Sequence, residues 1–116
     1  MIEKYKFSSL KSILFFGAIL LIQNLAFAQA SMESLFKQGN SAYNKAEYQK
    51  AISLYEQTLK MGQFSAELYY NLGNSYYKLN NIAESIYYFE KAKQLDPNDE
   101  DIAINSNFAK NMTIDA

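Results

Sequence analysis

An internal repeat constrains the fold of this chain more than any other feature. When residues 32–65 are aligned without a gap on residues 66–99, an offset of 34 residues, several aligned pairs are identical. These pairs are Glu33/Glu67, Gly39/Gly73, Asn40/Asn74, Ser41/Ser75, Tyr43/Tyr77, Ile52/Ile86 and Glu56/Glu90. A unit of this length cannot bury its apolar face alone, so we expect the two copies to stack on each other.

Each copy predicts two helices joined by a tight turn. The residues spaced as one helical face in 66–79 are Tyr69, Leu72, Gly73 and Tyr76. Asn80 and Asn81 favour a turn after this helix. The inward stripe of the second helix is predicted to contain Ile82, Ser85, Ile86, Phe89, Ala92 and Lys93. Glycine costs about 1 kcal/mol in a helix interior, so Gly73 predicts a close approach of Phe89 or Ser85.

Several residues predict where these helices begin and end. Ser65 can cap the helix over 66–79, Gly62 can close the helix before it, and Pro97 ends the inward stripe. Asn98 or Asp99 can cap a third helix of about 10–13 residues. We expect that helix to cap the array. The alternative is the first helix of a third repeat, with Asn107 where glycine would stand.

These features resemble the tetratricopeptide repeat, a helix–turn–helix unit of 34 residues. The second copy matches the family pattern at Tyr69, Leu72, Gly73, Tyr76, Phe89, Ala92 and Pro97, with Ser85 in place of alanine. The first copy matches at Leu35, Gly39, Ala42, Ala51 and Tyr55 and departs from it at Gln38, Thr58 and Gln63. The resemblance implies an all-α fold: two hairpins (32–65 and 66–99) stacked as a short right-handed solenoid, then a capping helix and tail (100–116).

A narrower resemblance covers residues 65–102. This stretch is similar to the amino-terminal repeats of the bacterial aerotolerance (Bat) family of tetratricopeptide proteins. Members of that family are larger and continue into membrane and SH3-like segments. The resemblance implies an envelope location and a role in binding a partner, and it raises the alternative that this chain is an amino-terminal fragment of a larger membrane-anchored protein.

Residues 1–28 predict a secretory signal peptide. Lys4, Lys6 and Lys11 precede an apolar run from residue 13 to residue 22, and small residues follow at 26 and 28. Cleavage after Ala28 is preferred to cleavage after Ala30, and would leave residues 29–116 in the periplasm or envelope. The alternative is a retained membrane anchor, although the apolar run is shorter than the roughly 20 residues that a span needs. A lipid anchor on cysteine is excluded because the chain has no Cys.

The amino-acid composition argues against several classes of function for this chain. The chain has no His and no Cys, so the commonest general base, metal ligands and nucleophile are missing. The 11 basic residues are all lysine and are balanced by 12 acidic ones, unlike the basic stripe of a nucleic-acid reader. We therefore expect no enzyme activity, cofactor, metal site, small-molecule substrate or nucleic-acid partner.

Stacked hairpins place their first helices along a concave face, and we predict that a protein or peptide partner binds there. The predicted partner-binding residues are Phe36, Asn40, Tyr43, Tyr70, Asn71, Asn74, Tyr77 and Lys78. Aromatic side chains offer contact area at low entropic cost, and amides can pair with a peptide backbone. Some members of this family bind a carboxylate group of their partner with a set of polar side chains. This chain matches that set only at Asn40 and Asn71. The alternative function is a self-associating structural module of the envelope, a homo-oligomer joined through the apolar ends of the array.

Overall fold

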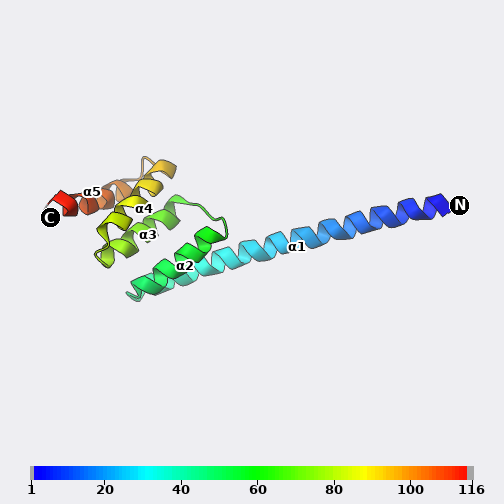
Figure 1. Ribbon diagram of the computed structural model, residues 1–116, viewed down its shortest axis with the longest axis horizontal. Coiled ribbons are helices and arrows are strands. Elements are labelled where there is room, and N and C mark those ends of the chain that lie inside the picture. The colour runs from blue at the N-terminus through cyan, green and yellow to red at the C-terminus, as the bar shows by residue number, and fades with distance from the viewer. Residues whose placement is uncertain (1, 115–116) are drawn as a thin grey trace. The chain divides into compact units, whose positions relative to one another are not determined.

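A computed structural model describes residues 2–114, and over this range the regular structure is helical (Figure 1). The helices are α1 (Ile2–Asn44), α2 (Tyr48–Lys60), α3 (Ala66–Lys78), α4 (Ile82–Leu95) and α5 (Glu100–Ile114). The predicted all-α fold is therefore confirmed. The chain divides into two compact units, Met1–Ser31 and Met32–Ala116, and each is described by itself.

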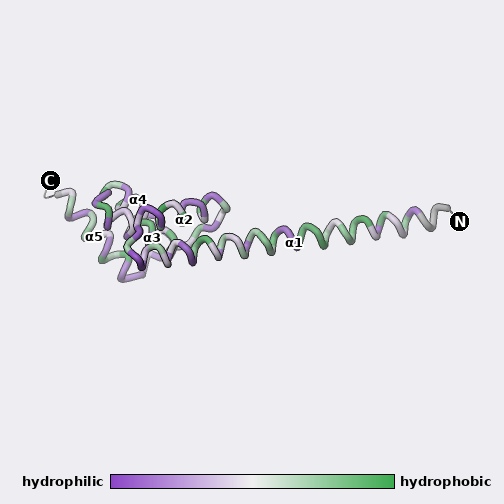
Figure 2. Tube along the Cα trace, turned by 90° about the horizontal axis from the view of Figure 1, so that it is seen from below, coloured by the Kyte–Doolittle hydropathy of each residue, from purple (hydrophilic) through white to green (hydrophobic). Residues whose placement is uncertain are grey.

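The first unit is the amino-terminal part of α1. Its apolar side chains, among them Phe7, Leu14, Leu21 and Phe27, are largely exposed, and Figure 2 shows the hydrophobic character of this stretch. The side-chain amide of Asn24 donates to its own helix, at the carbonyl of Leu20 (2.8 Å). Among the described residues, α1 is long and apolar enough to cross a membrane by length and composition alone, a test that signal sequences also pass.

The second unit is built from two helical hairpins and α5. The first hairpin joins the end of α1, from Met32, to α2, and the second joins α3 to α4 (Figure 1). Their shared core is the buried cluster Ala42, Ala51, Ile52, Tyr55, Leu68 and Leu72. Leu68 was missing from the predicted face of α3. It is buried because α3 lies between α2 and α4 and therefore covers two neighbours rather than one.

The two helical glycines permit close packing within each hairpin, as predicted for Gly73. A Cβ at Gly73 would lie 2.5 Å from Phe89 Cδ1, and one at Gly39 would lie 2.5 Å from Tyr55 Cε1. These distances are too short for real contacts, so any side chain here would displace the aromatic ring. Ser85, on the same inward stripe as Phe89, donates its hydroxyl to the carbonyl of Gly73 (2.9 Å).

Local interactions explain the helix boundaries. Ser65 Oγ accepts from the backbone N–H of Leu68 (3.1 Å), and Asp99 Oδ1 accepts from that of Ile102 (2.9 Å). The cap of α5 is thus Asp99, one of the two predicted candidates. Gly62 follows the end of α2 with φ +95°, as expected for a helix-closing glycine. The turn residue Asn80 has φ +60°, a conformation that asparagine tolerates better than most residues.

One part of the predicted inward stripe of α4 is wrong. Ser85, Phe89 and Ala92 are buried, whereas Lys93 is exposed. The ammonium group of Lys93 would lose its hydration in the hairpin interior, and burying an unpaired charge costs far more than a lysine stem gains by packing. The stripe is correspondingly narrower, with Ile82 and Ile86 half-buried at its edge.

Candidate protein-binding groove

The first helices of the two hairpins are joined by an amide–amide hydrogen bond. Asn71 Nδ2 on α3 donates to Asn40 Oδ1 on α1 (3.0 Å). The same oxygen accepts from the hydroxyl of Tyr55 on α2 (2.6 Å). Asn40 therefore links its own hairpin to the next one, and its side-chain oxygen already has two donors. Both amides are half-buried.

The same bond recurs one repeat later. Asn105 Nδ2 on α5 donates to Asn74 Oδ1 (2.9 Å) and to the hydroxyl of Tyr70 (2.8 Å), both on α3. Asn105 and Asn74 each lie 34 residues after Asn71 and Asn40. The helix α5 is therefore held against α3 in the way that α3 is held against α1.

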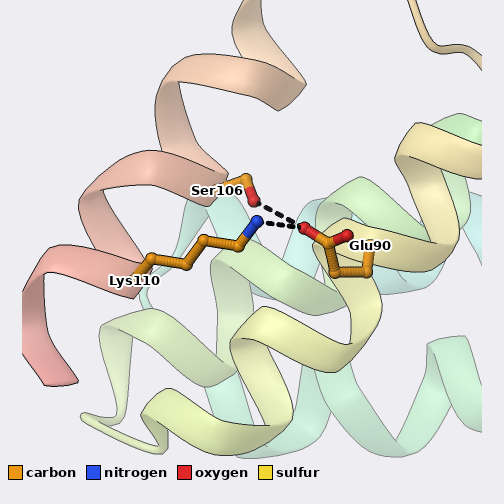
Figure 3. Close-up of polar contacts among 3 residues, drawn as sticks. All are labelled: Glu90, Ser106 and Lys110. Atoms are coloured by element: carbon orange, nitrogen blue, oxygen red, sulfur yellow. Dashed lines mark hydrogen bonds and ion pairs between the residues drawn. The ribbon is translucent and has the colours of Figure 1, made fainter.

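A second polar link is also repeated with this offset. The hydroxyl of Tyr76 donates to Glu56 Oε1 (2.8 Å), joining α3 to α2. In the next interface Lys110 Nζ lies 2.6 Å from Glu90 Oε1, which also accepts from Ser106 Oγ (3.2 Å; Figure 3). The hydrogen bond from Lys110 and its positive charge lower the pKa of Glu90 against a smaller opposing effect of burial.

The buried side chains of α5 follow the same register. Ile102, Ser106 and Ala109 are buried against the second hairpin, and the residues 34 positions earlier are buried on α3. Those earlier residues are Leu68, Leu72 and Ser75. The predicted capping helix thus packs on α4. It also occupies the position that the first helix of a third repeat would take, so α5 has features of both interpretations of the sequence, the capping helix and the third repeat.

A hollow of about 280 Å³ lies on the side of the first helices. We call it the groove; it is lined by Tyr43, Tyr70, Asn74, Tyr77, Lys78, Phe89, Asn105 and Phe108. These side chains come from α1, α3, α4 and α5, and the aromatic ones predominate. Among these lining residues the charged side chain is Lys78, which is exposed. Burial, and then the neighbouring Tyr48 and Tyr70, raise the pKa of Tyr43, so its hydroxyl stays a neutral hydrogen-bonding group.

The structure brings five of the predicted partner-binding residues together in the groove: Tyr43, Tyr70, Asn74, Tyr77 and Lys78. The other three lie elsewhere. Phe36 packs its ring against Tyr55, with centroids 5.9 Å apart, and Asn40 and Asn71 form the bond described above. For all eight residues, contact with a partner stays a prediction.

Sequence reasoning missed three residues that line the groove: Phe89, Asn105 and Phe108. Asn105 and Phe108 lie 34 residues after Asn71 and Asn74, so carrying the repeat offset into α5 would have found both. Phe89 was assigned to the hairpin interior, and it is indeed buried. Phe89 also lines the groove, which the residue pattern alone does not reveal.

The comparison with known families agrees with this architecture. The tetratricopeptide-repeat model matches residues 36–100, more than half of the chain. The protein therefore belongs to the tetratricopeptide-repeat family, whose domains generally mediate protein–protein interactions and whose members are typically scaffolds without catalytic activity. No curated protein matches the chain. In the part of the chain that the structure describes, no group of three or more acidic side chains is placed to hold a metal ion.

Proposed function

We propose that this protein is an exported scaffold that binds a protein or peptide partner in the groove. The observation that carries the proposal is the convergence of three half-buried tyrosines, Tyr43, Tyr70 and Tyr77, around one hollow. Tyrosine supplies a large apolar surface and a polar tip, and it loses little side-chain entropy when a partner binds.

The lining of the groove favours a particular kind of ligand. An apolar side chain of the partner would enter the hollow against Phe89 and Phe108. Asn74 and Asn105 already bond to each other, but each amide keeps further donor or acceptor capacity for a peptide backbone. Lys78 stands exposed at the groove and favours an acidic group beside that apolar side chain. The expected ligand is thus a segment that pairs an apolar anchor with a carboxylate.

Export is the second part of the proposal. It rests on the lysine-rich start, the apolar run and the small residues at 26 and 28. We propose cleavage after Ala28 and a periplasmic or envelope location. Measuring the intact mass of the protein purified from an envelope fraction tests this. A chain that begins at Gln29 supports the proposal. A chain that still contains residues 1–28 contradicts cleavage and indicates that the apolar part of α1 is a membrane anchor.

The groove is tested by comparing three forms of the full chain in capture experiments from an envelope extract. These are the native chain, a groove variant (Tyr77→Ser, Lys78→Glu) and a control variant (Tyr87→Ser, Lys91→Glu). The control makes the same chemical changes on α4, where Lys91 Nζ lies 5.3 Å from the exposed ring of Tyr87 and neither residue lines the groove.

A partner that is held by the native chain and the control variant but lost by the groove variant supports the proposal. Circular dichroism must first show that both variants keep the native helix content. A partner that all three forms retain, or that both variants lose, binds elsewhere and would exclude the groove as its site.

A further inference from the structure

An apolar stripe runs along the exposed side of α5. Ile104, Phe108 and Met112 are 50%, 59% and 47% exposed. Their spacing of four residues places them on one face of the helix. We call these three residues the α5 stripe. An exposed contiguous apolar patch on a small protein indicates a contact surface.

The stripe is a property of α5 and does not follow from the repeat. At the positions 34 residues earlier, α3 has Tyr70, Asn74 and Lys78. Two of the three positions are therefore polar on α3, where they line the groove, and apolar on α5. Tyr70 is also covered by the second helix of its own hairpin, since its ring lies 6.0 Å from that of Phe89.

A further helix of the repeat type does not fit on α5. In the two complete hairpins the second helix places an aromatic ring where Gly39 or Gly73 has no side chain. At the corresponding position α5 has Asn107. A Cβ at Gly73 would already lie 2.5 Å from the ring of Phe89, and the asparagine side chain extends further. The stripe is thus not suited to complete a third hairpin of this kind.

Head-to-tail stacking of copies is also disfavoured. The surface of α3 that packs on the first hairpin carries Leu68 and Leu72, and the corresponding positions on α1 are Ser34 and Gln38. Gln38 Nε2 donates to Ser34 Oγ (3.1 Å), and both residues are exposed. At these two positions the amino-terminal end of the array is therefore polar, and Ser34 and Gln38 offer no apolar side chain to the α5 stripe of another copy.

We propose that two copies of this chain pair through their α5 stripes about a twofold axis. In an antiparallel contact Phe108 meets Phe108 of the second copy, and Ile104 meets Met112. A self-complementary contact juxtaposes like residues, so charges near its centre would repel each other. Residues 102–109 contain no charged side chain, and Lys110 beside them is already paired with Glu90.

The absence of cysteine makes a direct test possible in the full chain. Phe108→Cys places a thiol at the proposed twofold axis, where its Cβ atom would meet that of the second copy at a distance that a disulfide can bridge. Gln38→Cys places a thiol at an exposed position on the polar end of the array and serves as the control. Each variant is oxidised at low protein concentration in three settings, namely alone, mixed with the other variant and in an envelope extract, and is then separated on a non-reducing gel.

The expected result is a covalent dimer with Phe108→Cys and a monomer with Gln38→Cys. Adding Ile104→Lys to Phe108→Cys should abolish the dimer, whereas adding Ile104→Leu should preserve it. Ile104 is half-exposed, so both additions leave the core intact, and circular dichroism checks the fold. The lysine variant loses the dimer because each ammonium group would lose its hydration against the apolar Met112 of the second copy, with no opposite charge to pair with.

Three outcomes would overturn the proposal. These are a monomer with Phe108→Cys, a mixed dimer between the Phe108→Cys and Gln38→Cys chains, which indicates head-to-tail stacking, and a disulfide to a different protein. The result is separable from that for the groove, although Phe108 borders both surfaces. The groove variant (Tyr77→Ser, Lys78→Glu) should lose its partner yet, combined with Phe108→Cys, still give the covalent dimer.

Discussion

The side chains of Asn40 and Asn71 are hydrogen-bonded across the boundary between the two hairpins, at 3.0 Å. The equivalent bond, from Asn105 to Asn74, measures 2.9 Å and joins the second hairpin to α5. A buried or half-buried amide must find partners or pay for its lost hydration. These bonds therefore set which residues of adjacent helices lie opposite each other, while the apolar core supplies most of the stabilisation.

The amide bond predicts a specific loss of stability in α5. Asn105→Ala removes two hydrogen bonds and leaves the Asn74 oxygen without its donor. We expect the free energy of unfolding to fall by about 1–3 kcal/mol, with faster amide hydrogen exchange in α5. Asn111→Ala on the same helix is the control. Asn111 is exposed, so its replacement should change stability by less than about 0.5 kcal/mol. Equal effects of the two variants would contradict the prediction.

Gly73→Ala should destabilise the second hairpin. Helix propensity alone favours alanine by about 1 kcal/mol, but the new Cβ would lie 2.5 Å from the ring of Phe89. Overpacking of this kind costs about 1–3 kcal/mol, so the net change should be a loss. Urea denaturation measures it.

Shortening the facing side chain provides the control for that steric cause. In a Phe89→Leu background the penalty of Gly73→Ala should shrink, because the leucine side chain can withdraw from the new methyl group. A stabilised Gly73→Ala variant, or a penalty that is the same in both backgrounds, would show that propensity rather than contact governs this position.

Alkaline pH should destabilise the protein through its buried tyrosines. Burial, followed by the nearby Tyr43, raises the pKa of Tyr55 from 10.0 to about 12. Below pH 10 the hydroxyl is protonated in both states, and stability does not depend on it. Between pH 10 and 12 the unfolded chain loses the proton and the folded chain keeps it, so stability falls as pH rises. Thermal melts followed by circular dichroism from pH 9 to 12 measure the change.

The variant Tyr55→Phe tests the assignment, because the second repeat already has Phe89 at the equivalent position. It should lower the free energy of unfolding by about 1 kcal/mol at neutral pH, through loss of the hydrogen bond to Asn40. It should also flatten the alkaline decline. Raised pKa values at Tyr43, Tyr76 and Tyr88 leave part of the decline in place. An unchanged alkaline profile would contradict the role of Tyr55.

Acid should weaken the link between α4 and α5. The pKa of Glu90 is lowered from 4.5, chiefly by the hydrogen bond from Lys110. The resulting stabilisation is present above pH 4.5 and is lost as pH falls through the lower folded-state pKa. Both side chains are more than two-fifths exposed, so solvent screens the pair and the effect should stay below about 1 kcal/mol. Hydrogen exchange in α5 between pH 3 and 6 measures it.

Glu90→Gln should remove most of this pH dependence while preserving the shape of the side chain. The exposed pair Glu33 and Lys37 on α1 provides a matched control, since Glu33→Gln removes one partner of an ion pair that does not join two helices. An acid response of α5 that Glu90→Gln leaves unchanged would place its origin at another carboxylate.

The repeat made much of the second unit predictable. Gly73 required a close neighbour, and that neighbour is Phe89. Ser65 and Asp99, which share the 34-residue offset, cap α3 and α5. Such features are readable because they depend on backbone geometry and on residues nearby in the sequence. The burial of Leu68 was not predicted, because it depends on where α2 packs rather than on the periodicity of α3.

The groove was likewise predictable from the sequence only in part. Tyrosine, asparagine and lysine at matching positions of two repeats indicated which helix faces could form a groove. Whether an amide there is free or already bonded depends on its neighbour across the interface, and Asn40 and Asn71 turned out to bond to each other. The 34-residue offset could have placed Phe108 on this face, but its convergence with Tyr43 depends on how two hairpins and α5 stack.

The sequence by itself determined the all-helical repeat, its hairpin boundaries and the chemistry available to the protein, because periodicity, caps and composition act locally along the chain. Only the tertiary structure decided that α5 takes the position of a third first helix, that five aromatic rings line one hollow, and that the α5 stripe stays exposed. These depend on which faces the stacked helices bury, and burial is set by packing between distant segments rather than by any segment alone.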